Sequence, residues 1–213
     1  MRTLKVEGKG EVTVTPDLCK YSIRICKKNS DYSSCYNELN DNSDKLRKLF
    51  VKAGIPADEI KTSNFSVRAV TVYSDELNTE LPDGYEGTQK INVKIPLDKK
   101  LMNTVLNTIS TDCIDDLSIS ISFGVSDTEA IRKQLIRNSV AAARINAETI
   151  SDAGGITLGQ IVSIEYGRNL ERFGSDDVYD IPTFLRRESD AVLSIVPADM
   201  TSTDTVTVVY EIL

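Results

Sequence analysis

Residues 4–17 read LKVEGKGEVTVTPD, and the alternation within this stretch predicts a long β-strand that ends in a turn. The even positions, from Leu4 to Val14, carry apolar residues or glycine, whereas the odd positions carry charged residues or threonine. A strand of this kind buries one face and exposes the other. The sequence Thr15-Pro16-Asp17 is typical of a turn, so we expect this strand to form a hairpin with the strand that follows it.

Two glycines, Gly8 and Gly10, interrupt the apolar face of this strand. A phosphate-binding loop needs a third glycine and lies at a strand-to-helix turn, and the Gly8-Lys9-Gly10 segment meets neither condition. Glycines on one face of a strand indicate a bulge or the close approach of another backbone. The sequence therefore favours a packing role for the two glycines.

The next predicted strand, residues 18–28, separates its side chains onto two faces. One face carries Cys19, Tyr21, Ile23 and Ile25, and the other carries Lys20, Ser22, Arg24, Cys26 and Lys28. Cys19 and Cys26 are seven residues apart, an odd offset that places them on opposite faces, so they cannot form a disulfide with each other. Reduced thiols are the simplest expectation.

Downstream, the periodicity switches between helical and strand spacing. Helices are predicted at 32–54, capped by Asn29, Ser30 or Asp31, at 98–109, capped by Asp98, and at 126–154, opened by a capping box from Ser126 to Glu129. Strands are predicted at 60–73, 85–95, 117–123, 160–166, 191–196 and 205–212, with an acidic hairpin tip at 75–83 and a charged loop or insertion at 167–190. Paired strands predict an α+β fold of antiparallel sheets with helices packed on one face. Within one domain of residues 1–213, the change of pattern near residue 97 suggests subdomains at 1–97 and 98–213.

The composition argues against several classes of binding partner and against insertion into a membrane. The net charge is −7, and 32 acidic and 25 basic residues alternate along most of the chain, which argues against nucleic acid and anionic membranes as partners. No apolar run approaches the roughly 20 residues of a membrane span, so membrane insertion is not expected. Charges interrupt the first residues, which leaves no secretory leader in this sequence. We therefore expect a cytoplasmic protein, or a periplasmic or envelope protein if a leader has been removed.

The chain contains no histidine, which excludes Ser-His-Asp and Cys-His catalysis and histidine metal ligation. Acidic clusters at Asp112, Asp115 and Asp116 and at Asp176, Asp177 and Asp180 lack the spacing of a calcium loop. We predict no catalytic, cofactor-binding or metal-binding residues. A hydrolase that uses paired carboxylates stays open as an alternative, although no pair stands out.

Two further alternatives concern single residues. Cys26 lies between Arg24 and Lys27, and because cations lower the pKa of a thiol, it is the one candidate for a redox-responsive cysteine. The simpler interpretation is that Cys26 is a small strand residue covered by a neighbouring side chain or by a second subunit. Tyr73 and Tyr85 flank the acidic tip and are either ordinary strand residues or anchors of an interface, where tyrosine is enriched.

The ordered set of these motifs resembles the SIMPL-domain (YggE-like) family. The opening VEGKGEVTVTPD is similar to the glycine-valine-proline signature of that family, and Gly54-Ile55 with Ile60-Lys61-Thr62 is similar to its junction after the first helix. Further matches are Gly84-Tyr85, the alanine-spaced helix through Ala143 and Ala147 with the exit at Gly154, Leu158, Gly159 and Ile164, and the final strand at 206–212. Together they span nearly the whole chain.

The resemblance implies two intertwined subdomains, a tendency to form homo-oligomers and no established catalytic residues. Many members are bacterial envelope proteins, some are linked to oxidative-stress tolerance, and an animal member associates with a signalling kinase. We therefore expect a non-enzymatic module that associates with itself or with a protein partner.

Overall fold

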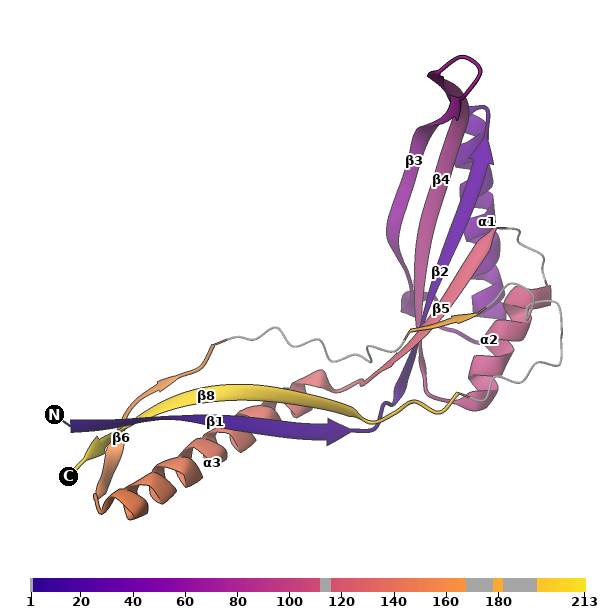
Figure 1. Cartoon of the computed structure of the whole chain (residues 1–213). Coiled ribbons are helices and arrows are strands. Elements are labelled where there is room, and N and C mark those ends of the chain that lie inside the picture. Colours follow the sequence, from indigo (N-terminus) through magenta and orange to yellow (C-terminus); the bar gives the residue numbers. More distant parts are fainter. Residues whose placement is uncertain (1, 112–115, 168–177, 182–194) are drawn as a thin grey trace. The chain divides into compact units, whose positions relative to one another are not determined.

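The structure is a computed structural model that describes residues 2–111, 116–167, 178–181 and 195–213. The α+β fold is confirmed, with two antiparallel sheets and three α-helices in these ranges. The chain divides into two compact units (Figure 1). Unit 1 comprises residues 1–16, 125–174 and 197–213, and unit 2 comprises residues 17–124 and 175–196.

This division differs from the boundary expected near residue 97. Both units are discontinuous, because the first strand of unit 1 pairs with the last strand of the chain, almost 200 residues later. The chain therefore passes repeatedly between the units, as an intertwined arrangement requires. The change of pattern at residue 97 marks only the start of a helix inside unit 2.

Unit 1 is a sheet of order β1-β8-β6 with one helix on it. Its elements are β1 (Arg2–Val14), β6 (Leu158–Glu165), β8 (Met200–Ile212) and α3 (Thr128–Gly154). The predicted hairpin between the first two strands is wrong. β1 pairs with β8 along its whole length, with Gly8 opposite Val206, and residues 15–17 carry the chain to the other sheet (Figure 1). Local alternation predicts that a strand exists but carries no information about a partner so distant in sequence.

Helix α3 matches the repeat of β1. Its buried residues recur at every fourth position: Ile131, Leu135, Ser139, Ala143, Ala147 and Ser151. Four helical residues rise about 6.0 Å, and two strand residues advance about 6.8 Å, so successive buried positions meet in step. The glycines allow this close approach: a Cβ on Gly8 would overlap the Ser139 carbonyl oxygen, and one on Gly10 would lie 2.5 Å from the Leu135 oxygen. The close backbone approach predicted for these glycines is confirmed.

The ends of α3 correct one detail. The N-cap is Asp127, whose carboxylate accepts a hydrogen bond of 2.8 Å from the Ala130 N–H, and not Ser126, where the predicted capping box begins. An aspartate and a serine are equally good caps, so sequence alone does not choose between neighbours. The helix ends at Gly154 and is capped by Gly155, which adopts the left-handed conformation at φ +63°.

Unit 2 is a five-stranded antiparallel sheet of order β3-β4-β2-β5-β7. Its elements are β2 (Leu18–Asn29), α1 (Tyr32–Lys52), the 3₁₀ turn η1 (Ala57–Glu59), β3 (Ile60–Ser74), β4 (Thr79–Pro96), α2 (Lys99–Thr111), β5 (Leu117–Gly124) and β7 (Tyr179–Ile181). The helices pack on one face and bury a core that includes Tyr21, Phe50, Ile91 and Met102. As predicted, Asp98 caps α2, and Asp31 is the residue that caps α1.

Two predicted segments lie largely outside the described residues. Within the expected loop at 167–190, the short strand β7 pairs with β5, so this part of the prediction is wrong; three residues are too few to show a strand period. Of the strand predicted at 191–196, only Ile195 and Val196 are described, and neither is in a strand.

Candidate interaction surfaces

Four aromatic side chains meet near the start of α1, on the helix-bearing face of unit 2. Tyr32 and Tyr36 stack with their ring centroids 6.4 Å apart, and each also makes an edge contact at 5.5 Å, Tyr32 with Tyr85 and Tyr36 with Phe65. The cluster remains open to solvent: Tyr32 is 49% exposed, Tyr36 41% and Phe65 40%. We call these four residues the aromatic patch. Half-exposed clustered aromatic rings are typical of protein interfaces.

The sheet places the patch by bringing three elements together. Tyr85 lies on β4, Phe65 lies on the edge strand β3, and the intervening Gly87 lets α1 approach. A Cβ on Gly87 would lie 3.1 Å from Leu39 and 3.2 Å from the Cys35 sulfur. The sequence singled out Tyr85 but missed its neighbours. The spacing of Tyr32 and Tyr36, one helical turn apart, is the feature that could have revealed a shared surface.

The β3–β4 hairpin continues past the end of β2 (Figure 1), and we call this extension the arm. Val72, Tyr73, Leu77 and Leu81 are all exposed, and Tyr73 hydrogen-bonds Asn78 across the turn. The turn itself covers residues 75–78, where Asn78 takes a positive φ of 49°. The acidic tip is thus shorter than the predicted 75–83, because β4 already begins at Thr79.

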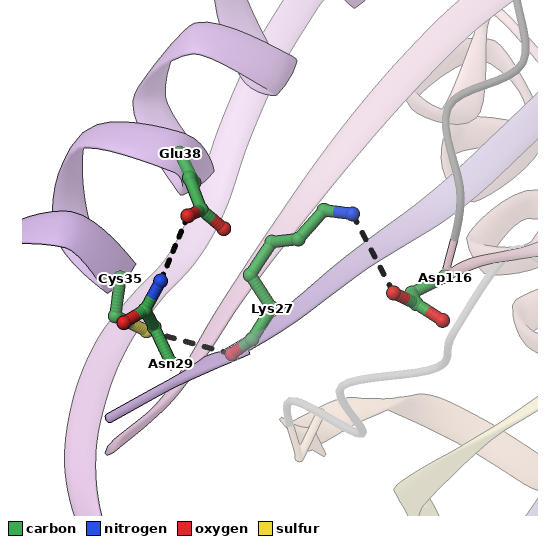
Figure 2. A network of polar contacts seen from close by, with 5 residues as sticks. All are labelled: Lys27, Asn29, Cys35, Glu38 and Asp116. Atoms are coloured by element: carbon green, nitrogen blue, oxygen red, sulfur yellow. Dashed lines mark hydrogen bonds and ion pairs between the residues drawn. The ribbon is translucent and has the colours of Figure 1, made fainter. Parts of the chain in front are cut away.

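Cys26 is not an activated thiol. It is partly buried, and burial raises the pKa of its thiol, with the carboxylates of Glu86 and Asp116 acting in the same direction and only Arg24 opposing them. Lys27, the other expected activator, forms an ion pair of 3.4 Å with Asp116 (Figure 2). The expectation that flanking cations lower the pKa of Cys26 is therefore wrong overall. Lys27 projects to the opposite face of the strand, and burial and the two carboxylates outweigh the lowering by Arg24.

The reactivity of Cys26 provides a test. A thiol with a raised pKa is mostly protonated near neutrality, so alkylation of Cys26 at pH 7 should be slower than alkylation of a cysteine in a short peptide. The rate should still be rising at pH 8.5, near the pKa of an ordinary thiol. Mass-mapped labelling with iodoacetamide, with the peptide as the reference, measures this. Faster labelling of Cys26 than of the peptide would restore the redox alternative.

The other thiols with described positions are structural. Cys19 is fully buried, and burial raises its pKa to about 12. Cys35 is also buried, and its sulfur contacts the carbonyl oxygen of Lys27 at 3.5 Å (Figure 2). It also contacts the carbonyl oxygen of Tyr85 at 3.6 Å. Cys19 and Cys26 lie on opposite faces of β2, as predicted, and all three are free. Cys113 lies outside the described residues.

Buried polar groups in unit 1 centre on Ser139. Its hydroxyl accepts from the Gly10 N–H at 3.1 Å and lies 2.9 Å from the carbonyl oxygens of Leu135 and Asp204. The buried Asp204 carboxylate accepts from the Tyr166 hydroxyl at 2.7 Å and from the Thr205 N–H at 2.8 Å. These hydrogen bonds give the buried polar groups of the strands and of α3 their partners. The arrangement supplies no nucleophile paired with a free base.

The remaining candidates bring no reactive set together. No group of three metal-ligating side chains forms among the described residues. Of the two acidic clusters, Asp116 pairs with Lys27 and Asp180 lies on β7, while Asp112, Asp115, Asp176 and Asp177 lie outside the described ranges. A hollow of about 290 Å³ is lined by Lys5, Val6, Glu7, Asn146, Thr149 and Ile150, and one of about 460 Å³ by Lys28, Asn29, Ser30, Pro82, Asp83 and Gly84. Across the part that the structure covers, no helix has both the length and the apolar character to cross a membrane.

A model of one protein family, described as "SIMPL: Protein of unknown function (DUF541)", matches residues 4–210. The "26 kDa periplasmic immunogenic protein" of Brucella melitensis biotype 1 and that of Brucella abortus (strain S19) are each 23% identical to the chain over 169 residues, which is 76% of this chain and 65% of the relative. The "Uncharacterized protein YggE" of Edwardsiella ictaluri (strain 93-146) is 21% identical over 160 residues, 75% of this chain and 65% of the relative. The chain thus spans just under two thirds of the length of these relatives.

Proposed function

The chain belongs to the SIMPL family of proteins of unknown function, and from this premise we propose that it is a non-enzymatic module that associates with copies of itself through unit 2. The observation that carries the proposal is the coincidence of the aromatic patch with an edge strand. β3 is 15 residues long and lies at the end of its sheet, and Phe65, Val72 and Tyr73 on it are 40%, 51% and 56% exposed.

An edge strand presents backbone N–H and C=O groups that a second chain can pair with. Soluble proteins usually protect such an edge or bury it in an interface, and β3 combines the edge with large apolar side chains. A two-fold contact places the same surface on both subunits, and an antiparallel pair of β3 edges satisfies that requirement. Self-association therefore covers the edge and the patch together.

The same proposal assigns no role in chemistry to the described side chains. It favours assembly over the two alternatives, since Cys26 has a raised pKa and no converging carboxylate pair lies in either hollow. A contribution to oxidative-stress tolerance would then not depend on Cys26. Because the Brucella relatives carry the word periplasmic in their names, we place the protein in the periplasm rather than the cytoplasm in this proposal.

Substitution within the aromatic patch tests the proposal. The double change Tyr36→Ser and Phe65→Ser should weaken self-association at least tenfold, since losing one aromatic hot spot at an interface costs about 2 kcal/mol or more. Both side chains are exposed in the single chain, so its folding should be little affected. Sedimentation velocity over a range of micromolar concentrations measures the dissociation constant.

Val51→Ser is the matched control, because Val51 lies on the same helix, is 51% exposed and is outside the patch. It should associate like the wild type. A wild-type chain that stays monomeric at every concentration would refute self-association. A wild-type oligomer that is insensitive to the patch variant would refute this surface.

A further inference from the structure

The face of the unit 2 sheet opposite the helices collects cations, although the whole chain is acidic. Directly opposite residues of antiparallel strands project to the same face, so the strand register defines its rows. One row holds Asn64, Lys90, Arg24 and Ser118, the next Lys61, Asn92, Ser22, Ser120 and, at its β7 end, Asp180, and the third Lys94, Lys20 and Ser122. We call these three rows the cationic face.

The register of β2 and β4 places like charges together twice. Lys20 is directly opposite Lys94, and Arg24 is directly opposite Lys90. Like charges in this position destabilise a sheet. The lysine pair shows the cost: the pKa of Lys20 is lowered, first by its burial and then by Lys94. We call the two pairs the rungs, and they lie four residues, or about 13 Å, apart along the strands.

The fold accommodates this repulsion instead of neutralising it. The Lys20 ammonium lies over Gly124, where a Cβ would be 2.5 Å from its nitrogen. Among the described residues, none of Lys20, Arg24, Lys61, Lys90 and Lys94 forms an ion pair, whereas Lys28 pairs with Asp83 and Arg68 with Glu86 nearer the arm. Like charges placed opposite each other without ion-pair partners break a local rule of sheet stability, and such violations are typical of functional sites.

We propose that the cationic face binds a soluble ligand that carries several phosphate groups, with one phosphate on each rung. Each rung concentrates two positive charges, which suits a phosphate group of charge about −1.5 to −2 better than a single carboxylate. Between the rungs, the Ser22 hydroxyl and the Asn92 amide offer neutral hydrogen-bond donors, while the Ser120 hydroxyl donates to the Ser22 carbonyl oxygen at 3.5 Å. The inference is independent of the proposed self-association.

Charge complementarity favours a chain-like ligand over a lipid surface. The cations occupy the middle of the face, and acids flank it, with Asp180 opposite Ser120 on β7 and Glu86 two rows toward the arm. A flat anionic membrane would meet those acids as well as the cations, whereas a narrow ligand covers the rungs alone. No aromatic side chain lies in the three rows, so the face offers no platform for stacked bases.

Calorimetric titration of the full chain with long-chain inorganic polyphosphate tests the inference, at about 0.15 M ionic strength where screening acts over about 8 Å. The double variants Lys20→Gln with Lys94→Gln, and Arg24→Gln with Lys90→Gln, should each weaken binding about tenfold or more. With short tripolyphosphate, the wild type should show two sites and each variant one. The control, Lys45→Gln with Lys48→Gln on exposed positions of α1, changes charge equally and should change affinity less than twofold.

Thermal unfolding without ligand gives a second readout. Removing like-charge repulsion should leave the rung variants as stable as the wild type or more so, and polyphosphate should raise the Tm of the wild type and of the α1 control more than that of either rung variant. The single variants Lys90→Gln and Lys94→Gln, at exposed positions, serve if a double variant misfolds. No polyphosphate binding, equal weakening in the α1 control, or tighter binding to phosphatidylglycerol vesicles or to an oligothymidylate would each overturn the proposal.

Discussion

Gly8→Ala is expected to destabilise unit 1 by about 3 kcal/mol or more, the upper end of what overpacking costs. The added methyl group would overlap the Ser139 carbonyl oxygen and the Ala143 nitrogen, which belong to helix backbone and cannot rotate away. Relief requires α3 to move off β1, which breaks the Gly10–Ser139 hydrogen bond at the same time. Urea unfolding and amide exchange across β1, β8 and α3 measure the loss.

Gly154→Ala is the control for this substitution. A Cβ at Gly154 would make only an ordinary contact of 3.8 Å with Ile156, and this residue is the last of α3. Alanine there should be neutral or stabilise the chain by up to about 1 kcal/mol, since it restricts the unfolded state. Equal effects of the two substitutions would contradict the close packing of α3 on β1.

Phe50→Ala is the second large effect, and it acts on unit 2. Phe50 is fully buried in the last turns of α1 and packs in the core beneath the sheet, so its loss should cost about 3 to 5 kcal/mol. The expected result is a lower urea midpoint with faster exchange in β2, β4 and β5. Val51→Ala, the adjacent and half-exposed position, should change stability by no more than about 0.5 kcal/mol. A small change in stability on Phe50→Ala would mean that α1 does not pack against this core through Phe50.

Local periodicity predicted most elements of both units. An element that buries one face has apolar residues at regular intervals in the sequence, so the pattern can be recognised within that element alone. The alternation of β1, the stripe of α1 and the caps at Asp31 and Asp98 all appear within a few residues of their predicted positions. The GKG segment was also interpretable, since two glycines on one strand face imply a nearby backbone.

The features that depend on pairing between strands distant in the sequence could not be predicted. β1 pairs with β8 instead of β2, and this one partner choice changes the division of the chain into units. The cationic face was not predicted from the sequence for the same reason. The sequence placed Lys20 and Arg24 on one side of a strand, but only the register with β4 brings Lys94 and Lys90 opposite them. Cations that are mixed with acids along the chain are thereby gathered on one face of the sheet, so the net charge of the chain did not reveal this surface.

The pairing of β1 with β8 has a consequence for biosynthesis. Ribosomes add about 5 to 20 residues per second, so β1 leaves the ribosome about 10 to 40 s before its partner strand exists. Most of unit 2 lies between them and is complete by residue 124, apart from the short return through 175–196. The nascent chain therefore completes most of its larger unit first, while the apolar face of β1 remains without its partner strand.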